Sequence, residues 1–247
     1  MQKNVISHIA LVVALVAVIA AGVMIFGSSM GLWDPITGFI ASRKYHNVLG
    51  YIVVALALIS LVSGMMIKTD SPKARGTAKS VVALVLGIAM LSPMLKGLII
   101  EPVKYPPIHD ITTNTDAPPQ FVFLTDSRIG AKNTLVYGGA EIAAQQLKAF
   151  PYIKPIMSEL SSDAAFKKAL SIANEMDWII VEQQPQTLRF EATARTPFFN
   201  FADDIVVVVT SSEQGSRIDL RSVSRIGIGD AGVNAKRIQE FSHKFTE

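Results

Sequence analysis

The chain has 247 residues, of which 50% are apolar and 17% are charged, and it contains no cysteine. So apolar a composition excludes a disordered protein. The lack of cysteine excludes a disulfide scaffold, a zinc–cysteine site, an iron–sulfur cluster and a thiol nucleophile. The net charge of +3 is unevenly spread, with 8 basic and 2 acidic residues in the first 100 positions and 15 and 18 in the rest. The basic character therefore belongs to the N-terminal part and does not indicate nucleic-acid binding.

Three apolar runs predict membrane-spanning helices over residues 5–27, 48–67 and 81–100. Each run has about the 20 residues that a helix needs to cross a hydrocarbon core of about 30 Å, and in lipid the backbone must be helical. The first run is longer than the apolar part of a signal peptide, so we expect it to be retained. None of the runs contains Asp or Glu, which favours an anchor over a transporter. We expect a membrane anchor over residues 1–104 and a second domain over residues 105–247.

The basic residues of the short loops predict the orientation. Lys3 and four basic residues within 68–79 lie on one side of the membrane, and Arg43, Lys44 and Lys104 lie on the other. The richer side is expected in the cytoplasm. The sequence therefore predicts a multi-pass protein of a bacterial inner membrane, with a cytoplasmic N-terminus and a C-terminal domain in the periplasmic part of the cell envelope.

The chain beyond the spans begins without helical signals. Residues 101–138 contain five prolines, which predicts an extended segment that leaves the membrane and then lies on the folded domain. A short helix is expected over residues 139–149, stopped by Pro151. The extended piece between Pro151 and Pro155 could supply a strand. Hydroxyl and carboxylate groups at residues 161–163 then signal the start of an amphipathic helix.

The remaining pattern predicts four strands and a last helix. Residues 178–181 and 205–209 are apolar runs, whereas residues 188–195 and 217–221 alternate apolar and polar side chains as strands with one wet face do. Asp230 can cap a helix that places four residues on one face: Asn234, Ile238, Phe241 and Phe245. Because the links are short, antiparallel pairing is favoured. The predicted fold is α+β: a helix, a four-stranded antiparallel sheet and a helix, with both helices on one face of the sheet.

Several motifs resemble one family. They are the stretches 198–204 (FFNFADD), 218–227 (IDLRSVSRIG), 230–238 (DAGVNAKRI), 107–113 (PIHDITT), 118–119 (PP), 31–34 (GLWD) and 37–39 (TGF). Together they resemble the domain of unknown function 1499 family in a form with three N-terminal spans. The sequence departs from the family pattern at 150–153, which reads FPYI where YPDI is expected. The resemblance implies an extracytoplasmic C-terminal domain and assigns no activity.

The wet faces of two strands supply the first candidate site. Arg189, Arg195, Arg221 and Arg225 are expected to point away from the helices, and we expect the side chain of Arg221 to lie on an open sheet surface. Glu191, Arg217 and Asp219 share this face in the alternation. Arginine forks suit phosphate or carboxylate groups, so a lipid headgroup, an envelope glycan or an acidic partner could bind there. The alternative is a solvated face with cross-strand ion pairs.

The second candidate site surrounds the turn before the last helix. It comprises Ser222, Ser224, Asp230, Asn234 and Arg237, of which the last three share a helix face. The alternative, which we favour, is structural: Asp230 caps the helix, and the other polar groups tie the turn to it.

His109 and Asp110 form the third candidate site. A histidine beside a carboxylate could orient a metal or act as a base. A metal site needs more ligands than this pair offers, however, and the sequence has no nucleophile elbow, Walker loop or zincin motif.

The sequence therefore favours a non-enzymatic envelope protein that binds an anionic ligand or another envelope protein. The alternative is a membrane-bound hydrolase or transferase that acts on an envelope component. We expect the lipid bilayer as a partner, and no catalytic residue, metal, cofactor or nucleic acid.

Overall fold

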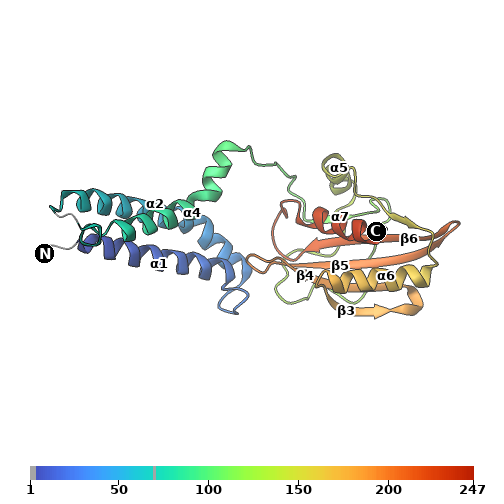
Figure 1. Cartoon of the computed structure of the whole chain (residues 1–247). Coiled ribbons are helices and arrows are strands. Elements are labelled where there is room, and N and C mark those ends of the chain that lie inside the picture. The colour runs from blue at the N-terminus through green and yellow to red at the C-terminus, as the bar shows by residue number, and fades with distance from the viewer. Residues whose placement is uncertain (1–3, 69–70) are drawn as a thin grey trace. The chain divides into compact units, whose positions relative to one another are not determined.

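The computed structural model describes residues 4–68 and 71–247. The chain forms two compact units (Figure 1). The first comprises the chain up to Val103 together with Phe198–Asn200, and the second comprises Lys104–Pro197 and Phe201–Glu247.

The first unit is a helical bundle. Its helices are α1 (Val5–Phe26), α2 (Pro35–Met66), α3 (Pro72–Arg75) and α4 (Thr77–Ile99). Three of them, α1, α2 and α4, are long and apolar enough to cross a membrane. Helix α2 begins at Pro35, so it contains nearly all of the predicted second span at residues 48–67 and extends beyond its start. Proline fits the first turn of a helix, and at about 1.5 Å per residue α2 reaches about 48 Å, more than a hydrocarbon core needs.

Small residues line the contacts between the long helices. In α1 the buried positions follow a spacing of three and four residues: Ser7, Ala10, Ala14, Ala17 and Ala21. In α2 the buried Gly50, Val53 and Ala57 continue the pattern, and Gly87 of α4 lies against Val53. Small side chains let helix backbones approach closely, which is how helices associate in lipid, where apolar burial gives no advantage.

The second unit is an α+β domain. Its elements are β1 (Asp110–Thr112), α5 (Gly139–Ala149), β2 (Ile156–Ser158), α6 (Ser162–Glu175), β3 (Ile179–Gln184), a 3₁₀ turn (Pro185–Thr187), β4 (Arg189–Arg195), β5 (Ala202–Ser212), β6 (Gly215–Ser224) and α7 (Val233–Thr246). The strands form one antiparallel sheet in the order β1-β6-β5-β4-β3, and β2 also pairs with β6. The sheet thus has six strands and not the predicted four. The two additional strands have three residues each, too few to show a period of two in the sequence.

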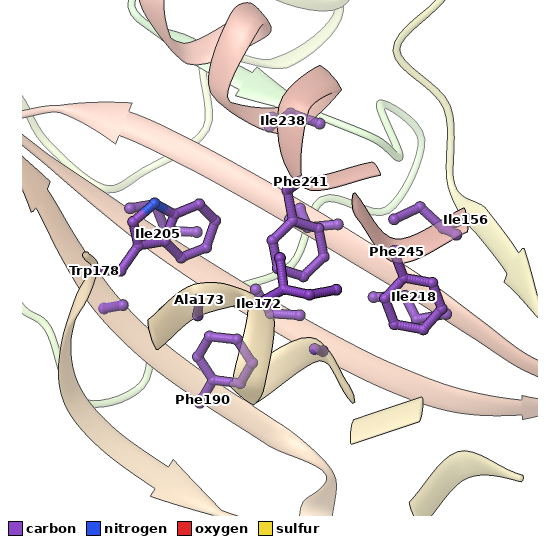
Figure 2. Close-up of a cluster of buried hydrophobic side chains, with 14 of the residues drawn as sticks. Ile156, Ile172, Ala173, Trp178, Phe190, Ile205, Ile218, Ile238, Phe241 and Phe245 are labelled. Carbon is purple, nitrogen blue, oxygen red and sulfur yellow. The ribbon is translucent and has the colours of Figure 1, made fainter. Parts of the chain in front are cut away.

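The hydrophobic core lies between one face of the sheet and helices α6 and α7 (Figures 1 and 2). Phe190 and Ile205 of the central strands and Phe241 of α7 are fully buried in it. Trp178 stacks on Phe241 with ring centroids 5.4 Å apart. The predicted faces of both helices are confirmed, since Phe166 of α6 and Phe241 of α7 pack into the same core.

Candidate functional site

The predicted open arginine face is not open. Arg221 points away from the helices, as the alternation requires, but none of its surface is exposed. Residues 113–138, which form no helix or strand, lie over this face and bond to its side chains. The expectation of an exposed Arg221 was therefore wrong, because the proline-rich segment covers the strand that carries it. We call the charged side chains between the sheet and this segment the polar layer: Asp110, Arg128, Glu191, Asp204, Arg221 and Arg225.

Arg221 lies at the centre of the polar layer. Its Nε and Nη2 donate to the two carboxylate oxygens of Asp110 at 2.9 and 2.7 Å. The guanidinium also donates to the carbonyl oxygens of Pro119 and Leu135 at 3.3 and 2.8 Å. The ring of Tyr137 has its centroid 5.3 Å from the guanidinium carbon, and burial raises the pKa of this tyrosine to about 12. Arg221 thus fastens the covering segment to the sheet.

Glu191 holds the next part of the segment. Its side chain is fully buried and accepts hydrogen bonds from the backbone N–H groups of Val122, Phe123 and Leu124. Three backbone N–H groups that donate to one carboxylate stabilise its negative charge, as the free N–H groups of a helix N-terminus stabilise a bound anion. This residue therefore positions a loop.

Asp204 joins two arginines. Its fully buried carboxylate accepts from Nε of Arg128 at 2.5 Å and from Nη2 of Arg225 at 2.7 Å. Thr193 also donates to it, at 2.9 Å. Arg225 in addition donates to the carbonyl oxygen of Ile129 at 2.9 Å. The guanidinium of Arg225 is thus largely occupied within the protein.

The other predicted ligand residues are less buried. The side chain of Arg189 is 16% exposed, and its Nη2 donates to Gln120 O and lies 3.4 Å from Glu191 Oε1. Arg195 is exposed at the end of β4. Of the four arginines proposed from the sequence, Arg221 and Arg225 therefore share one buried layer, Arg189 borders it, and Arg195 is exposed.

The turn residues meet on the opposite face of the sheet, beside α7. Arg237 donates to Asp203 at 2.6 Å and to Asn234 Oδ1 at 2.5 Å. Asn234 in turn donates to Ser224 Oγ at 2.9 Å and accepts from Ser222 Oγ at 2.6 Å. These bonds tie the first turn of α7 to the ends of β5 and β6, as the structural interpretation requires.

Asp230 stands at the start of α7. Its two carboxylate oxygens accept from the backbone N–H groups of Gly232 and Asn234 at 2.9 and 2.7 Å. Burial raises the pKa of Asp230 above its ordinary value, and the backbone hydrogen bonds oppose this shift. Gly232, the cap residue itself, has φ +80°, and the ring of Tyr105 lies where a β-carbon would project. The N-cap residue of α7 is therefore Gly232 and not the predicted Asp230, which precedes it by two residues and accepts from backbone N–H groups of the turn and of the first helical turn.

The residues from β1 to α7 match a family model. The model, described as Protein of unknown function (DUF1499), covers residues 110–245. The chain belongs to this family. The resemblance found in the sequence motifs is therefore confirmed. No curated protein matches the chain.

The DUF1499 domain gives His109 and Asp110 separate partners. His109 Nδ1 lies 3.2 Å from the carbonyl oxygen of Ile228, whereas Asp110 is paired with Arg221. Within residues 4–68 and 71–247, no three His, Asp or Glu side chains are grouped so that they could hold a metal ion. His109 and Asp110 therefore each bond to a different part of the fold, which favours a structural role for both residues.

Sequence reasoning missed two residues that organise the DUF1499 domain. Arg128 lies in a segment with no periodicity, so nothing in the sequence indicated that it is buried against Asp204. Gln146 is fully buried, although it is a polar residue of α5. Its side chain accepts from the backbone N–H of Thr112 at 2.9 Å and donates to the carbonyl oxygen of Thr112 at 2.7 Å. The side-chain amide of Gln146 thus forms the two backbone hydrogen bonds that a further strand beside β1 would otherwise form with Thr112.

The two edges of the sheet therefore differ. At one edge Gln146 closes β1, and the three-residue strand β2 continues the same edge with an exposed Met157. At the other edge the last strand is β3, which has six residues. The side chains of Ile179 and Val181 on β3 are 58% and 45% exposed. A register shift between Ile180 and Glu182 places a bulge at Val181.

Proposed function

We propose that this protein is a membrane-anchored, non-catalytic interaction protein of the cell envelope. In this proposal the DUF1499 domain lies outside the cytoplasm and binds an extended segment of another envelope protein along β3. The observation that carries the proposal is the β3 edge with its exposed Ile179 and Val181. A segment added to a sheet edge gains main-chain hydrogen bonds, and apolar side chains at the edge give it specificity.

The difference between the two edges supports this choice. Proteins close or blunt sheet edges that would otherwise pair with any strand. Gln146 does so at β1. At β3, the bulge and the charge of Glu182 limit unspecific pairing, but the apolar side chains remain exposed. An edge of this kind suits one partner of matching shape better than indiscriminate association.

The other functions expected from the sequence have less support. Arg221 and Arg225 are neutralised by Asp110 and Asp204, so an anionic ligand would have to displace a carboxylate from each. A hydrolase or transferase needs a carboxylate or histidine that can exchange a proton with a substrate. The buried Asp110, Asp203 and Asp204 are each held by an arginine, which favours a structural role for them. The outward placement rests on the distribution of Lys and Arg around the spans.

Cross-linking from a single cysteine tests the proposal. Because the chain has no cysteine, Val181→Cys introduces one unique thiol at the edge, and Lys167→Cys introduces one on the exposed surface of α6. With a photoactivatable thiol reagent in native membranes, we expect one discrete cross-linked species from position 181 and none from position 167.

A second substitution distinguishes strand addition from chance proximity. The backbone N–H of Gln183 donates to the neighbouring Glu182 carboxylate, so Gln183→Pro removes a donor at this edge. Proline is tolerated in an edge strand where the lost N–H does not bond to the neighbouring strand of the sheet. A partner segment added along β3 would, however, lose the hydrogen bond from this N–H. The cross-link from Val181→Cys should then disappear while the melting temperature is kept. Persistence of the cross-link in the proline variant would contradict the proposal.

A further inference from the structure

A histidine and a lysine from two spans meet at one end of the membrane bundle. Nζ of Lys79, in the first turn of α4, contacts Nε2 of His8, in the first turn of α1. The side chain of His8 is exposed and that of Lys79 is partly buried. Two nitrogen groups thus converge on the outer surface of the bundle, near one end of two helices that are long and apolar enough to cross a membrane.

The backbone around this pair is held firmly. Asn4 donates to the carbonyl oxygens of Ser60 and Arg75 at 2.8 and 2.9 Å, so the start of α1 is tied to α2 and to the end of α3. Gly76 has φ +70°, and Ser7 Oγ occupies the place where a β-carbon of residue 76 would project. Helices α1 and α4 therefore approach each other as closely as a glycine permits, which keeps the two side chains together.

No carboxylate balances the pair within the described part of the bundle. Its described acidic residues are Asp34, at the start of α2, and Glu101, after the end of α4. Both lie toward the end of the bundle opposite the starts of α1 and α4. An ammonium has three N–H donors, of which the contact with His8 uses one.

We propose that Lys79, oriented by His8, binds the phosphate group of an anionic phospholipid. At about 1.5 Å per residue, His8 lies about 5 Å and Lys79 about 3 Å from the starts of helices that cross the membrane, which is the depth of the headgroups. A phosphate oxygen there accepts from the ammonium N–H groups that the contact with His8 leaves free. The Nε2 atom of His8 accepts from the ammonium and so orients it, while Nδ1 faces the carbonyl oxygen of Asn4 at 3.4 Å. Basic pockets between spans hold anionic headgroups in this way. The location on lipid-facing helices favours a phospholipid over free phosphate.

Lipid binding to the purified full-length protein tests this site. Native mass spectrometry of the delipidated protein in detergent measures the affinity for phosphatidylglycerol and for phosphatidylcholine, whose choline cancels the charge. We expect phosphatidylglycerol to bind roughly tenfold more tightly or better, the value of one charge-assisted hydrogen bond. Lys79→Gln should abolish the difference, and His8→Leu, which removes the acceptor that orients the ammonium, should reduce it, whereas Lys79→Arg should retain it. Lys96→Gln, near the other end of α4, is the matched control and should leave it unchanged.

Three results would overturn the proposal. Equal binding of the two lipids would remove the preference for an anionic headgroup, and full retention of that preference in both Lys79→Gln and His8→Leu would place the site elsewhere. Competition by inorganic phosphate at the concentration of the lipid would identify a soluble anion as the ligand. Size-exclusion profiles of the variants show whether the bundle remains folded, and because His8 is exposed, His8→Leu tests the site even if Lys79→Gln unfolds.

Discussion

Arg221 and Asp110 form a two-point ion pair between β6 and β1, although they are 111 positions apart in the chain. The side chain of Arg221 is 0% exposed and that of Asp110 is 7% exposed. Because Arg221 also binds the carbonyl oxygens of Pro119 and Leu135, the pair joins the sheet edge and both ends of the covering segment. The polar layer therefore holds the covering segment on the sheet through buried hydrogen bonds, as apolar contacts hold the helices on the other face.

We expect Arg221→Ala to destabilise the DUF1499 domain by roughly 3–5 kcal/mol, since it leaves the carboxylate of Asp110 buried without its partner. Arg217→Ala is the matched control on the same strand. Its side chain is 36% exposed and pairs with Asp219, so the expected loss is within about 1 kcal/mol. Denaturant unfolding followed by near-ultraviolet circular dichroism measures both. Equal stability of the two variants would show that the polar layer contributes little to the fold.

The pH dependence of stability should report Asp230. Burial raises the pKa of this carboxyl in the folded protein, so the folded state holds the proton more tightly than the unfolded chain does. The contribution of Asp230 is then most favourable below its unfolded pKa of 3.8 and is lost as the pH rises through the higher folded value. Relative to Asp230→Asn, which does not titrate, the native protein should lose stability over this interval. Parallel unfolding curves at pH 4 and pH 7 give the difference, and a constant difference would contradict the assignment.

The sequence predicted the elements whose patterns are local. The buried faces of α6 and α7 follow from helical spacing, and the direction of Arg221 follows from alternation along β6. The covering of that face was not predictable, because residues 113–138 have no period and are ordered by bonds to Glu191 and Arg221. Likewise, the role of Gln146 was not predictable, because its side chain bonds to Thr112, which lies 34 positions away in the chain.

Packing of the spans should depend on Gly87. A β-carbon there would lie 2.8 Å from Val54 Cγ2 and 3.0 Å from Val53 Cγ1. Gly87→Ile should therefore force α4 away from α2, at a cost of roughly 1–3 kcal/mol or more. Gly97→Ile is the control on the same helix, since nothing lies within 4 Å of its β-carbon position. Thermal unfolding in detergent should show a lower melting temperature for the first variant alone, and equal values would mean that α2 and α4 do not pack through Gly87.

The orientation of the chain can be tested with single cysteines, because the protein has none of its own. The excess of Lys and Arg around residues 68–79 predicts that this loop is cytoplasmic and that Glu247 is outside. A membrane-impermeant maleimide applied to intact spheroplasts should label Glu247→Cys and, on the exposed start of α2, Arg43→Cys. It should label Lys68→Cys only after the membrane is permeabilised. The reverse pattern would place the DUF1499 domain in the cytoplasm and, because β3 would then meet only cytoplasmic proteins, would remove the basis for an envelope partner.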